Sequence, residues 1–409
     1  MKVLLVNKYL YIKGGSEKYM FSVADAFKSL GHEVIFFSMI DEKNIQCSTS
    51  KYFVKNKSKD GNLASKLNLI LHLSYSKEAY TNMTRLLNDE KPDLVILNLI
   101  HKQLTCSVIQ AIKDYDKNLP IFWTVHDLIH VCPAYTMIDG KGEVCEKCLS
   151  GDFSNCVRNK CCHGSKTMSF LSTREAKQIK KHGWYDLVDL YICPSMFYKN
   201  MLEKSHFTSS KIICLRNPLP LDTIFEDESS NNGYLLYFGR LSKEKGVKTL
   251  IDAVRGVDCE LYIVGTGPEE EPLKQYVIDN SISNVCFKGF QTGDALNELV
   301  SKSRCVVLPS EWYENGPYSA LEAMAHGKPL IVSNKGGLPE LVTNNGYIYS
   351  DFSQLVASIK SIISLDSRTY LQLCSNSAEK AKQLFDPKQY ISSLLEEYYE
   401  KTKTSSSLV

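Results

Sequence analysis

The first 38 residues read MKVLLVNKYLYIKGGSEKYMFSVADAFKSLGHEVIFFS, a pattern that predicts a strand, a helix and a second strand. The apolar run at residues 2–7 predicts the first strand, and the glycine turn Gly14-Gly15 follows it. A helix is expected over residues 16–30, because Gly31 ends the helical pattern. Residues 33–38 predict the second strand. Apolar strands that alternate with helices suit a parallel sheet with both faces covered.

The same alternation continues to the end of the chain. Further strands are expected at residues 94–97, 121–125, 190–193 and 212–215, and then at 234–238, 260–264, 285–288, 305–308 and 329–332. The acidic and polar stretch 226–233 separates the two sets and is the best candidate for a linker. The sequence therefore predicts an α/β protein with two doubly wound, Rossmann-like domains that face one another across a ligand-binding cleft.

The length of 409 residues also suits two domains. We expect an N-terminal domain at residues 1–215, a linker at 216–233 and a C-terminal domain at 234–386. The remaining residues, 387–409, are expected to form a helix that returns to the first domain, followed by a polar tail.

Composition excludes several classes of protein. Hydrophobic residues make up 44% of the chain and charged residues 23%, as in ordinary globular proteins, so a disordered or fibrous chain is excluded. The chain contains no apolar run of about 18 residues, which is the length that would predict a membrane-spanning helix. We expect a cytoplasmic location, with contact at the inner face of the membrane as an option. The basic residues Lys51, Lys55, Lys57, Lys59 and Lys66 would either meet anionic lipid headgroups or form a solvated loop.

The most informative motif is PSEWYENGPYSALEAMAHGKP, residues 309–329. It predicts the end of a strand, a loop, and a helix that begins near Pro317 and ends at Gly327. The first amides of a helix are unpaired and positively polarised, so the helix start at Tyr318, Ser319 and Ala320 suits a diphosphate.

Two glutamates in this motif are candidate ligands of a sugar nucleotide. Glu322, on the helix, could accept hydrogen bonds from both ribose hydroxyls, and Glu314, in the loop, could hold hydroxyls of a donor sugar. The alternative is that both glutamates face solvent, as most glutamates do.

Two further motifs follow predicted strands. The run YFGRLSKEKG places Arg240 and Lys245 between Gly239 and Gly246, where two cations could neutralise a departing diphosphate. A basic turn is also common as plain surface decoration. The run IVGTGP contains Gly265 and Gly267, which could allow close approach of a ligand or could simply form a turn. The same choice applies to Gly14 and Gly15.

Together these motifs resemble family 4 of the retaining glycosyltransferases, which have the GT-B architecture of two Rossmann-like domains. The likeness runs from Gly14-Gly15 to Gly336-Gly337 and Glu340, and its most specific element is the glutamate pair. Where the family usually has histidines after the strand at 94–97, this chain has Ile96 and Asn98.

The resemblance implies retaining transfer of a sugar from a UDP- or GDP-type donor to a glycan or lipid-linked acceptor, in bacterial surface polysaccharide assembly. It implies no catalytic metal. It assigns catalysis to Glu314, Arg240, Lys245 and His126, the histidine of the TVHD run, which could instead be a structural residue oriented by Asp127. The donor-binding residues would be Gly14, Gly15, Gly239, Gly265, Gly267, Tyr318, Ser319 and Glu322.

Two other functions compete with this interpretation. A nucleotide-sugar epimerase shares the architecture but should release no free nucleotide during turnover. A non-catalytic zinc-knuckle binding protein is the second alternative. The net charge of +2 argues against this second alternative with nucleic acid as its partner.

Six of the fourteen cysteines fall within residues 132–163, which we interpret as an insert. The Cys145-x-x-Cys148 spacing with further thiols nearby predicts a structural zinc ion, while free or oxidised thiols are the alternative. A subset of family 4 resembles the chain here too. On that match the ligands would be Cys132, Cys145, Cys148 and Cys161, with Cys156 and Cys162 left over.

Overall fold

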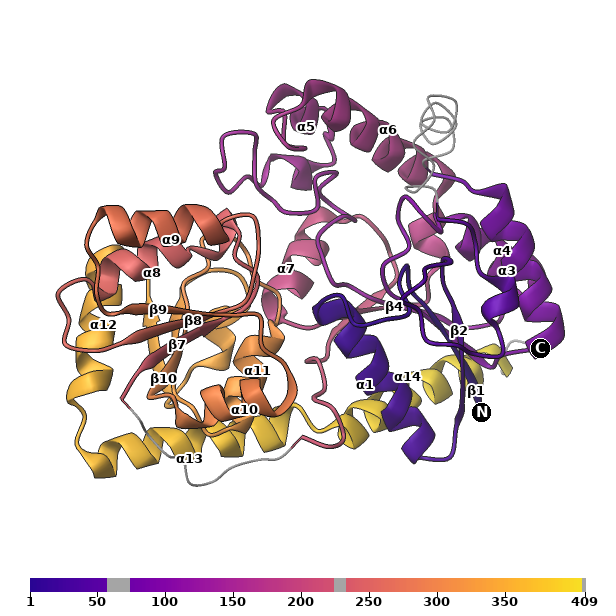
Figure 1. Ribbon diagram of the computed structural model, residues 1–409. Helices are drawn as coiled ribbons and strands as arrows, with labels where there is room; N and C mark the ends of the chain where they lie inside the picture. The colour runs from indigo at the N-terminus through magenta and orange to yellow at the C-terminus, as the bar shows by residue number, and fades with distance from the viewer. Residues whose placement is uncertain (57–73, 224–232, 407–409) are drawn as a thin grey trace. The chain divides into compact units, whose positions relative to one another are not determined.

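The computed structural model describes residues 1–56, 74–223 and 233–406, and the chain divides into two compact units (Figure 1). Unit 1 comprises Met1–Leu221 together with Pro387–Val409, and unit 2 comprises Asp222–Asp386. Each unit contains one six-stranded parallel sheet.

The sheet of unit 1 has the strand order β2-β1-β3-β4-β5-β6. Its strands are β1 (Lys2–Val6), β2 (Glu33–Phe37), β3 (Leu94–Leu97), β4 (Ile121–Thr124), β5 (Leu190–Cys193) and β6 (Lys211–Cys214). Every residue of β3, β4 and β5 is buried, as expected for parallel strands with helices on both faces. The chain adds β2 on one side of β1 and then β3 on the other, so the winding direction changes between β1 and β3.

Helices surround this sheet. They are α1 (Gly15–Ser29), α3 (Lys77–Glu90), α4 (Ser107–Tyr115), α5 (Ser154–Arg158), α6 (Lys166–His182) and α7 (Met196–Ser205), with short 3-10 turns η1 (Ser50–Tyr52), η2 (Lys147–Ser150) and η3 (Trp184–Leu187). Serine hydroxyls cap the first amides of α3, α6 and α7, which is the preferred way to begin a helix.

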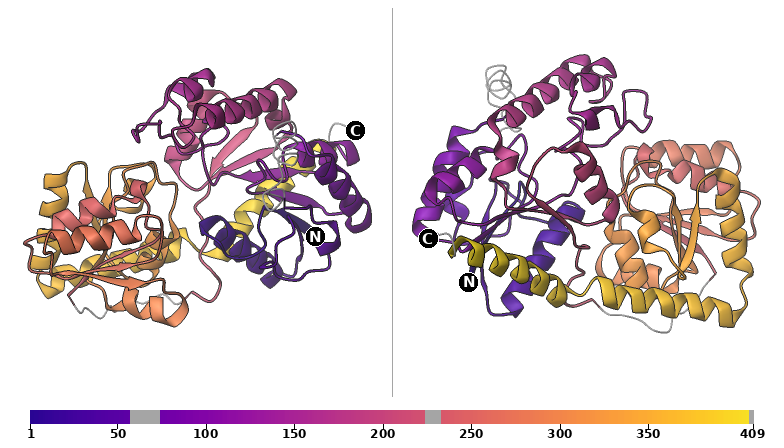
Figure 2. Two further views of the ribbon diagram at one scale, coloured as in Figure 1. Left: turned by 45° about the horizontal axis from the view of Figure 1, so that its top comes forward. Right: turned by 180° about the vertical axis from the view of Figure 1, so that it is seen from behind.

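The last helix, α14 (Pro387–Ser406), packs on α1, as the two views of Figure 2 show. The buried hydroxyl of Tyr19 on α1 is hydrogen-bonded to the Tyr390 hydroxyl at 2.7 Å and to Thr124 Oγ1 at 2.8 Å. At the far edge of the sheet, Lys211 Nζ pairs with Glu397 at 2.6 Å. These contacts place the last helix of the chain in unit 1.

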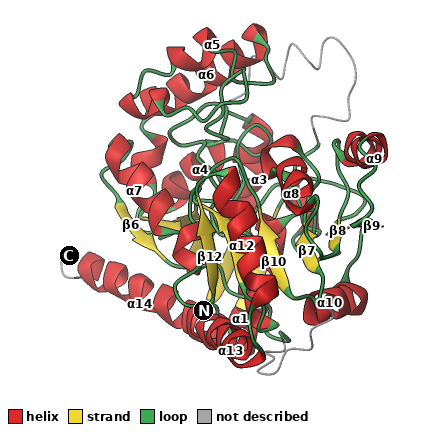
Figure 3. Ribbon diagram, turned by 90° about the vertical axis from the view of Figure 1, so that its left-hand side faces the viewer, coloured by secondary structure: helices red, strands yellow, loops and turns green. Residues whose placement is uncertain are grey.

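The sheet of unit 2 has the order β12-β11-β10-β7-β8-β9. Its strands are β7 (Leu235–Phe238), β8 (Leu261–Val264), β9 (Val285–Gly289), β10 (Cys305–Leu308), β11 (Leu330–Ser333) and β12 (Gly346–Tyr349). Its helices are α8 (Val247–Val254), α9 (Glu270–Asp279), α10 (Gly293–Lys302), α11 (Tyr318–Ala325), α12 (Phe352–Ser364) and α13 (Ser367–Leu384), with 3-10 turns η4 (Lys243–Lys245) and η5 (Leu338–Leu341). Helix α8 packs against α12 (Figure 3), and α11 packs against α13.

The predicted fold class is confirmed, because both sheets are parallel and doubly wound. All eleven predicted strands are present, each within one residue of its predicted ends. The strand that sequence analysis missed is β12, an edge strand of the sequence GYIY in which only Tyr349 is buried.

Two observations concern the membrane. Within the described ranges, no helix combines the length and the hydropathy needed to cross a bilayer. Lys51 and Lys55 of the predicted basic cluster are exposed, whereas Lys57, Lys59 and Lys66 lie outside the described residues.

Candidate functional site

Two loops of unit 2 leave the sheet where its winding direction changes. The chain enters at β7, adds β8 and β9 on one side, and then adds β10 on the other side of β7. Because β7 and β10 are parallel neighbours, the loops that follow them, 239–246 and 309–317, leave the same edge of the sheet. Doubly wound sheets bind their ligands at this kind of position.

A buried ion pair joins the two loops. Lys245 Nζ lies 2.6 Å from Glu314 Oε1, and the Glu314 residue is 6% exposed. The same oxygen accepts hydrogen bonds from Ser310 Oγ at 2.6 Å and from the Trp312 indole at 2.9 Å. In the part of the chain that the structure describes, every side-chain hydrogen bond to Glu314 goes to Oε1, so Oε2 is left for another donor.

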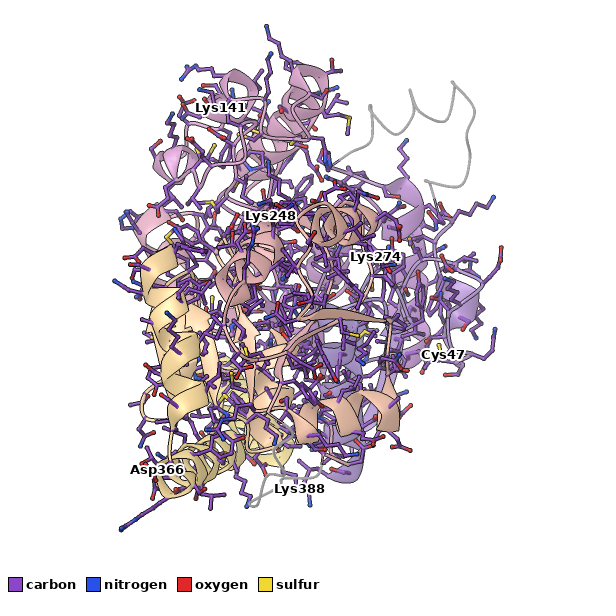
Figure 4. All side chains as sticks on the ribbon, turned by 60° about the vertical axis from the view of Figure 1, so that its left-hand side comes forward. Cys47, Lys141, Lys248, Lys274, Asp366 and Lys388 are labelled. Atoms are coloured by element: carbon purple, nitrogen blue, oxygen red, sulfur yellow. The ribbon has the colours of Figure 1, made fainter. Side chains whose placement is uncertain are left out.

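The surroundings of Glu314 keep it ionised. Burial alone would raise its pKa, but the charge of Lys245 and the hydrogen bonds from Lys245, Ser310 and Trp312 hold the pKa below its ordinary value of 4.5. A carboxylate of this kind is a weak base and a good hydrogen-bond acceptor. Other lysines of unit 2, such as Lys248 and Lys274 (Figure 4), pair with acidic residues of their own helices instead.

Glycines let the loops approach closely. A Cβ atom on Gly246, whose φ is +66°, would lie 2.0 Å from the Pro309 carbonyl oxygen, so only glycine allows loop 239–246 to contact loop 309–317 here. A Cβ on Gly336 would lie 2.2 Å from the Glu314 carbonyl oxygen, and the Gly337 amide donates to that oxygen at 2.6 Å. Gly336-Gly337 therefore supports the backbone of Glu314.

The predicted donor-contacting glycines also have roles within the chain. A Cβ on Gly265 would lie 1.9 Å from the Gly239 carbonyl oxygen, and a Cβ on Gly267 would lie 2.1 Å from that of Leu241. The loop after β8 thus packs directly on the loop that carries Arg240. Packing between loops explains Gly265 and Gly267 without a ligand, and their contact with a donor stays a prediction.

Arg240 and the start of α11 complete the site. Arg240 is exposed, and its guanidinium has no acidic partner among the described residues. Helix α11 begins after Pro317, and the Ala320 amide donates to the Pro317 carbonyl at 2.9 Å. That amide is therefore already bonded, and its predicted role as a diphosphate ligand is wrong. Ser319 keeps its place at the helix start, and Glu322 lies one helical turn further on, partly buried.

In unit 1, His126 is held by Asn98. Asn98 Nδ2 donates to the Val6 carbonyl at 3.3 Å, so its Oδ1 faces His126 Nε2 at 2.8 Å. The Nε2 atom therefore carries the hydrogen, and Nδ1 is an acceptor. Burial lowers the pKa of His126 to about 3, so the ring is neutral near pH 7. Asp127 does not orient His126, contrary to the sequence-based alternative, because the carboxylate accepts the Ile129 amide at 3.1 Å.

The backbone conformation does not explain why glycine occupies positions 14 and 15. Gly14 caps α1 with φ −168°, an extended conformation open to any residue, and neither glycine has a positive φ. Both are exposed, and a Cβ on Gly14 would meet only Glu17 Oε2, at 3.8 Å. Their proposed contact with a ligand stays a prediction.

Sequence analysis missed a group of charged residues at the switch point of unit 1. Lys8 follows β1, Lys102 follows β3 and Asp127 follows β4, and Glu175 on α6 faces them. Burial lowers the pKa of Lys8 and raises that of Asp127, and the opposite charges partly oppose both shifts. Burial also raises the pKa of Glu175 to about 7. Polar residues in the loops after buried strands were the available signal for Lys8, Lys102 and Asp127.

Several cysteines of the insert lie close together. Cys132, Cys148, Cys156 and Cys162 are buried, and the Sγ atoms of Cys156 and Cys162 are 4.0 Å apart. The pKa of Cys148 is raised to about 12, mainly by burial and to a smaller extent by the neighbouring thiols. Among the described residues, which include all six thiols, no group of three or more His, Cys, Asp or Glu is arranged to hold a metal ion. The zinc ion stays a prediction.

Comparisons with known proteins agree with the two-unit fold. The family described as Glycosyltransferase Family 4 matches residues 13–223, about half of the chain, and the family described as Glycosyl transferases group 1 matches residues 222–384.

Curated relatives include an uncharacterized glycosyltransferase of Methanocaldococcus jannaschii, 28% identical over 185 residues, which are 45% of this chain. The chain spans about half the length of that relative, 51%. An uncharacterized 42.6 kDa protein in the cps region of Klebsiella pneumoniae is 24% identical over 375 residues, which cover 87% of this chain and 91% of the relative.

Solved structures show the same fold. Sucrose-phosphate synthase from Thermosynechococcus elongatus has a TM-score of 0.72 at 17% identity and covers 99% of this chain and 100% of its own. HepE of Anabaena, solved in complex with UDP, has a TM-score of 0.65 at 17% identity and covers 97% of this chain and 100% of its own. The predicted GT-B fold is thereby confirmed.

The Lys245–Glu314 pair predicts a specific pattern of stabilities. Lys245→Met leaves a buried carboxylate without its cation and should lower the free energy of unfolding by about 2 kcal/mol. The loss is no larger because the Lys245 side chain is partly exposed, so solvent screens the pair. Adding Glu314→Gln should recover part of the loss, since the amide needs no cation. Urea denaturation measures the free energy of unfolding of each variant. An equal loss in Lys245→Met and in the double variant would contradict the pairing.

The pair also predicts a dependence on pH. Because the pKa of Glu314 is lower in the folded state, its pairing stabilises the fold fully above pH 4.5 and loses that effect as pH falls through the lowered pKa. The stability difference between the native chain and Glu314→Gln should be constant from pH 8 to about 5 and shrink below that. Thermal unfolding across this range tests it, and a difference that changes near neutral pH would contradict the assignment.

Proposed function

Because the chain belongs to Glycosyltransferase Family 4, we propose that it is a retaining glycosyltransferase that uses a nucleotide diphosphate sugar of the UDP or GDP type. The acceptor is a glycan or a lipid-linked glycan. The observation that carries the proposal is the meeting of Lys245 and Glu314 at the switch point of unit 2, beside the exposed Arg240 and the start of α11.

The site suits a diphosphate leaving group. Cleavage of the anomeric bond leaves negative charge on the diphosphate, and charges fixed in advance lower the barrier to this step. Arg240, which has no acidic partner among the described residues, and Lys245 supply positive charge. The amide of Ser319 at the start of α11 adds a donor in the favourable field of the helix end.

The glutamates suit hydroxyl recognition rather than proton transfer. The lowered pKa of Glu314 makes it a weak base, and its Oε2 atom would accept donor-sugar hydroxyls. Glu322, one turn into α11, would accept the ribose hydroxyls. Retention then follows from attack on the face of the leaving group, with the diphosphate as proton acceptor, and no catalytic metal takes part.

His126 would contact the donor sugar as a neutral acceptor. Its Nε2 hydrogen is bound to Asn98, which leaves the Nδ1 lone pair for a hydroxyl group. The lowered pKa of His126 means that the ring would not supply positive charge near pH 7.

Surface polysaccharide assembly is the setting that we propose. Its support is the relative from a cps region, together with the family resemblance. Peripheral contact with anionic lipid through Lys51 and Lys55, which are exposed, belongs to the same proposal, as does a cytoplasmic location.

A screen of nucleotide sugars tests the function. One donor should raise the melting temperature by mass action and be hydrolysed slowly to free nucleotide diphosphate. Glu314→Gln should lower kcat/KM for that donor about 100-fold, or about 3 kcal/mol. Glu311→Gln is the matched control, because Glu311 lies in the same loop, is exposed and bonds Thr249 at 2.6 Å.

Three outcomes of the screen would count against the proposal. No stabilising donor would oppose donor binding, and equal effects of the two substitutions would oppose the role of Glu314. Conversion of a nucleotide sugar to its epimer without release of nucleotide would favour an epimerase. The anomeric configuration of the product, read from its proton coupling constants, decides between retention and inversion.

We also propose a structural zinc ion in the insert, on the strength of the cysteine spacing. Purified protein should contain zinc by elemental analysis, and Cys145→Ser/Cys148→Ser should lose it. The matched control is Cys47→Ser, which lies outside the insert. Native protein without zinc, or a double variant that retains it, would contradict the proposal.

A further inference from the structure

Three buried hydroxyl groups connect the last helix of the chain with the strand that leads to His126. The Tyr390 hydroxyl on α14 lies 2.7 Å from the Tyr19 hydroxyl on α1, which in turn lies 2.8 Å from Thr124 Oγ1 on β4. All three residues are at most 3% exposed. A hydroxyl group can donate one hydrogen bond and accept others, so Tyr19 can bond both neighbours at once.

Tyr19 also contacts His126 with its ring. The two ring centroids lie 5.0 Å apart at an interplanar angle of 70°, an edge-to-face arrangement. The hydrogen bond between His126 Nε2 and Asn98 fixes one atom of the imidazole, whereas the contact with Tyr19 restrains the tilt of the ring plane. Because Thr124 lies only two positions before His126, Tyr19 holds both the end of β4 and the imidazole that follows it.

Tyr390 lies near the start of α14, shortly after the chain leaves unit 2. Ion pairs hold the far end of this helix: Lys211 Nζ lies 2.6 Å from Glu397, and Lys401 Nζ lies 2.8 Å from Asp189. These contacts do not involve the Tyr390 hydroxyl. Removal of that hydroxyl should therefore leave α14 packed on α1 and change the hydrogen bonding of Tyr19.

The surroundings of Tyr19 differ from those of an ordinary buried tyrosine. Tyr370 on α13 is an example of the ordinary kind: it is 3% exposed, and its hydroxyl donates to the Arg304 carbonyl at 2.9 Å. Such a bond to the backbone satisfies the hydroxyl and stabilises the fold. The Tyr19 hydroxyl instead bonds side chains of two other elements, and its ring contacts a candidate site residue.

We propose that Tyr390 is a positioning residue for His126 and that it acts through Tyr19. The Tyr390 hydroxyl fixes the Tyr19 hydroxyl beside Thr124, the Tyr19 ring then fixes the imidazole, and the Nδ1 lone pair keeps one direction. The last helix of the chain thus supports the candidate site in unit 1. The effect on the reaction rests on the proposed function, in which His126 contacts the donor sugar.

NMR of isotope-labelled histidine tests the positioning without any ligand. The ring signals of His126, assigned from their loss in His126→Gln, should shift in Tyr390→Phe. They should shift further in Tyr19→Phe, which removes both hydrogen bonds of the Tyr19 hydroxyl. Tyr370→Phe is the matched control, because it removes an equally buried hydroxyl, and it should leave these signals in place. Signals of His126 that do not move in Tyr390→Phe would overturn the proposal.

Kinetics test the consequence for the reaction. With a UDP- or GDP-sugar that the native chain hydrolyses, Tyr390→Phe should lower kcat/KM about 5-fold, because a small displacement of a positioned group costs rate. The double variant Tyr19→Phe/Tyr390→Phe should lose no more than Tyr19→Phe alone, since Tyr390 acts through the Tyr19 hydroxyl. Losses that multiply in the double variant, or an equal loss in Tyr370→Phe, would overturn the proposal.

Urea denaturation separates positioning from loss of stability. Tyr390→Phe and Tyr370→Phe should lower the denaturation midpoint alike, since each removes one buried hydroxyl group. A loss of activity that follows the midpoint in both variants would reduce Tyr390 to a structural residue. Absence of turnover with every nucleotide sugar would count against the proposed function, and the NMR comparison would still decide the positioning.

Discussion

Lys245 and Glu314 meet where the sheet of unit 2 reverses its winding direction, and the candidate donor site is organised around that contact. Three donors converge on Glu314 Oε1, which fixes the side chain and leaves Oε2 open. The glycines serve the same arrangement: Gly246 allows the two loops to touch, and Gly336 supports the backbone of Glu314. A residue with a Cβ at either position would push apart the loops that present the cations and the carboxylate.

The fold was predictable largely because its inner strands are buried on both faces. Such strands appear in the sequence as continuous apolar runs, and β3, β5 and β10 were placed with their observed ends. The edge strand β12 is only four residues long and has one buried residue, Tyr349, so burial on both faces does not mark it. Lys245 and Glu314 were also named from the sequence, but their ion pair was not, because a contact across 69 positions depends on the order of the strands.

Other features of the candidate sites depend on tertiary packing and could not be foreseen. The resemblance led us to expect a histidine where the chain has Asn98, and only the structure shows that Asn98 orients His126. The spacing of Cys145 and Cys148 predicted a zinc ion, but it gave no sign that Cys156 and Cys162, the two cysteines left over from that set, lie close together.

The central claim is that the two loops after β7 and β10, with the start of α11, hold a nucleotide diphosphate. Hydrogen–deuterium exchange of the full chain, with and without saturating UDP or GDP, tests this most directly. We expect slower exchange in peptides that cover residues 239–246 and 310–322 with whichever nucleotide binds. Binding that leaves both segments unchanged and protects other parts of unit 2 would contradict the account.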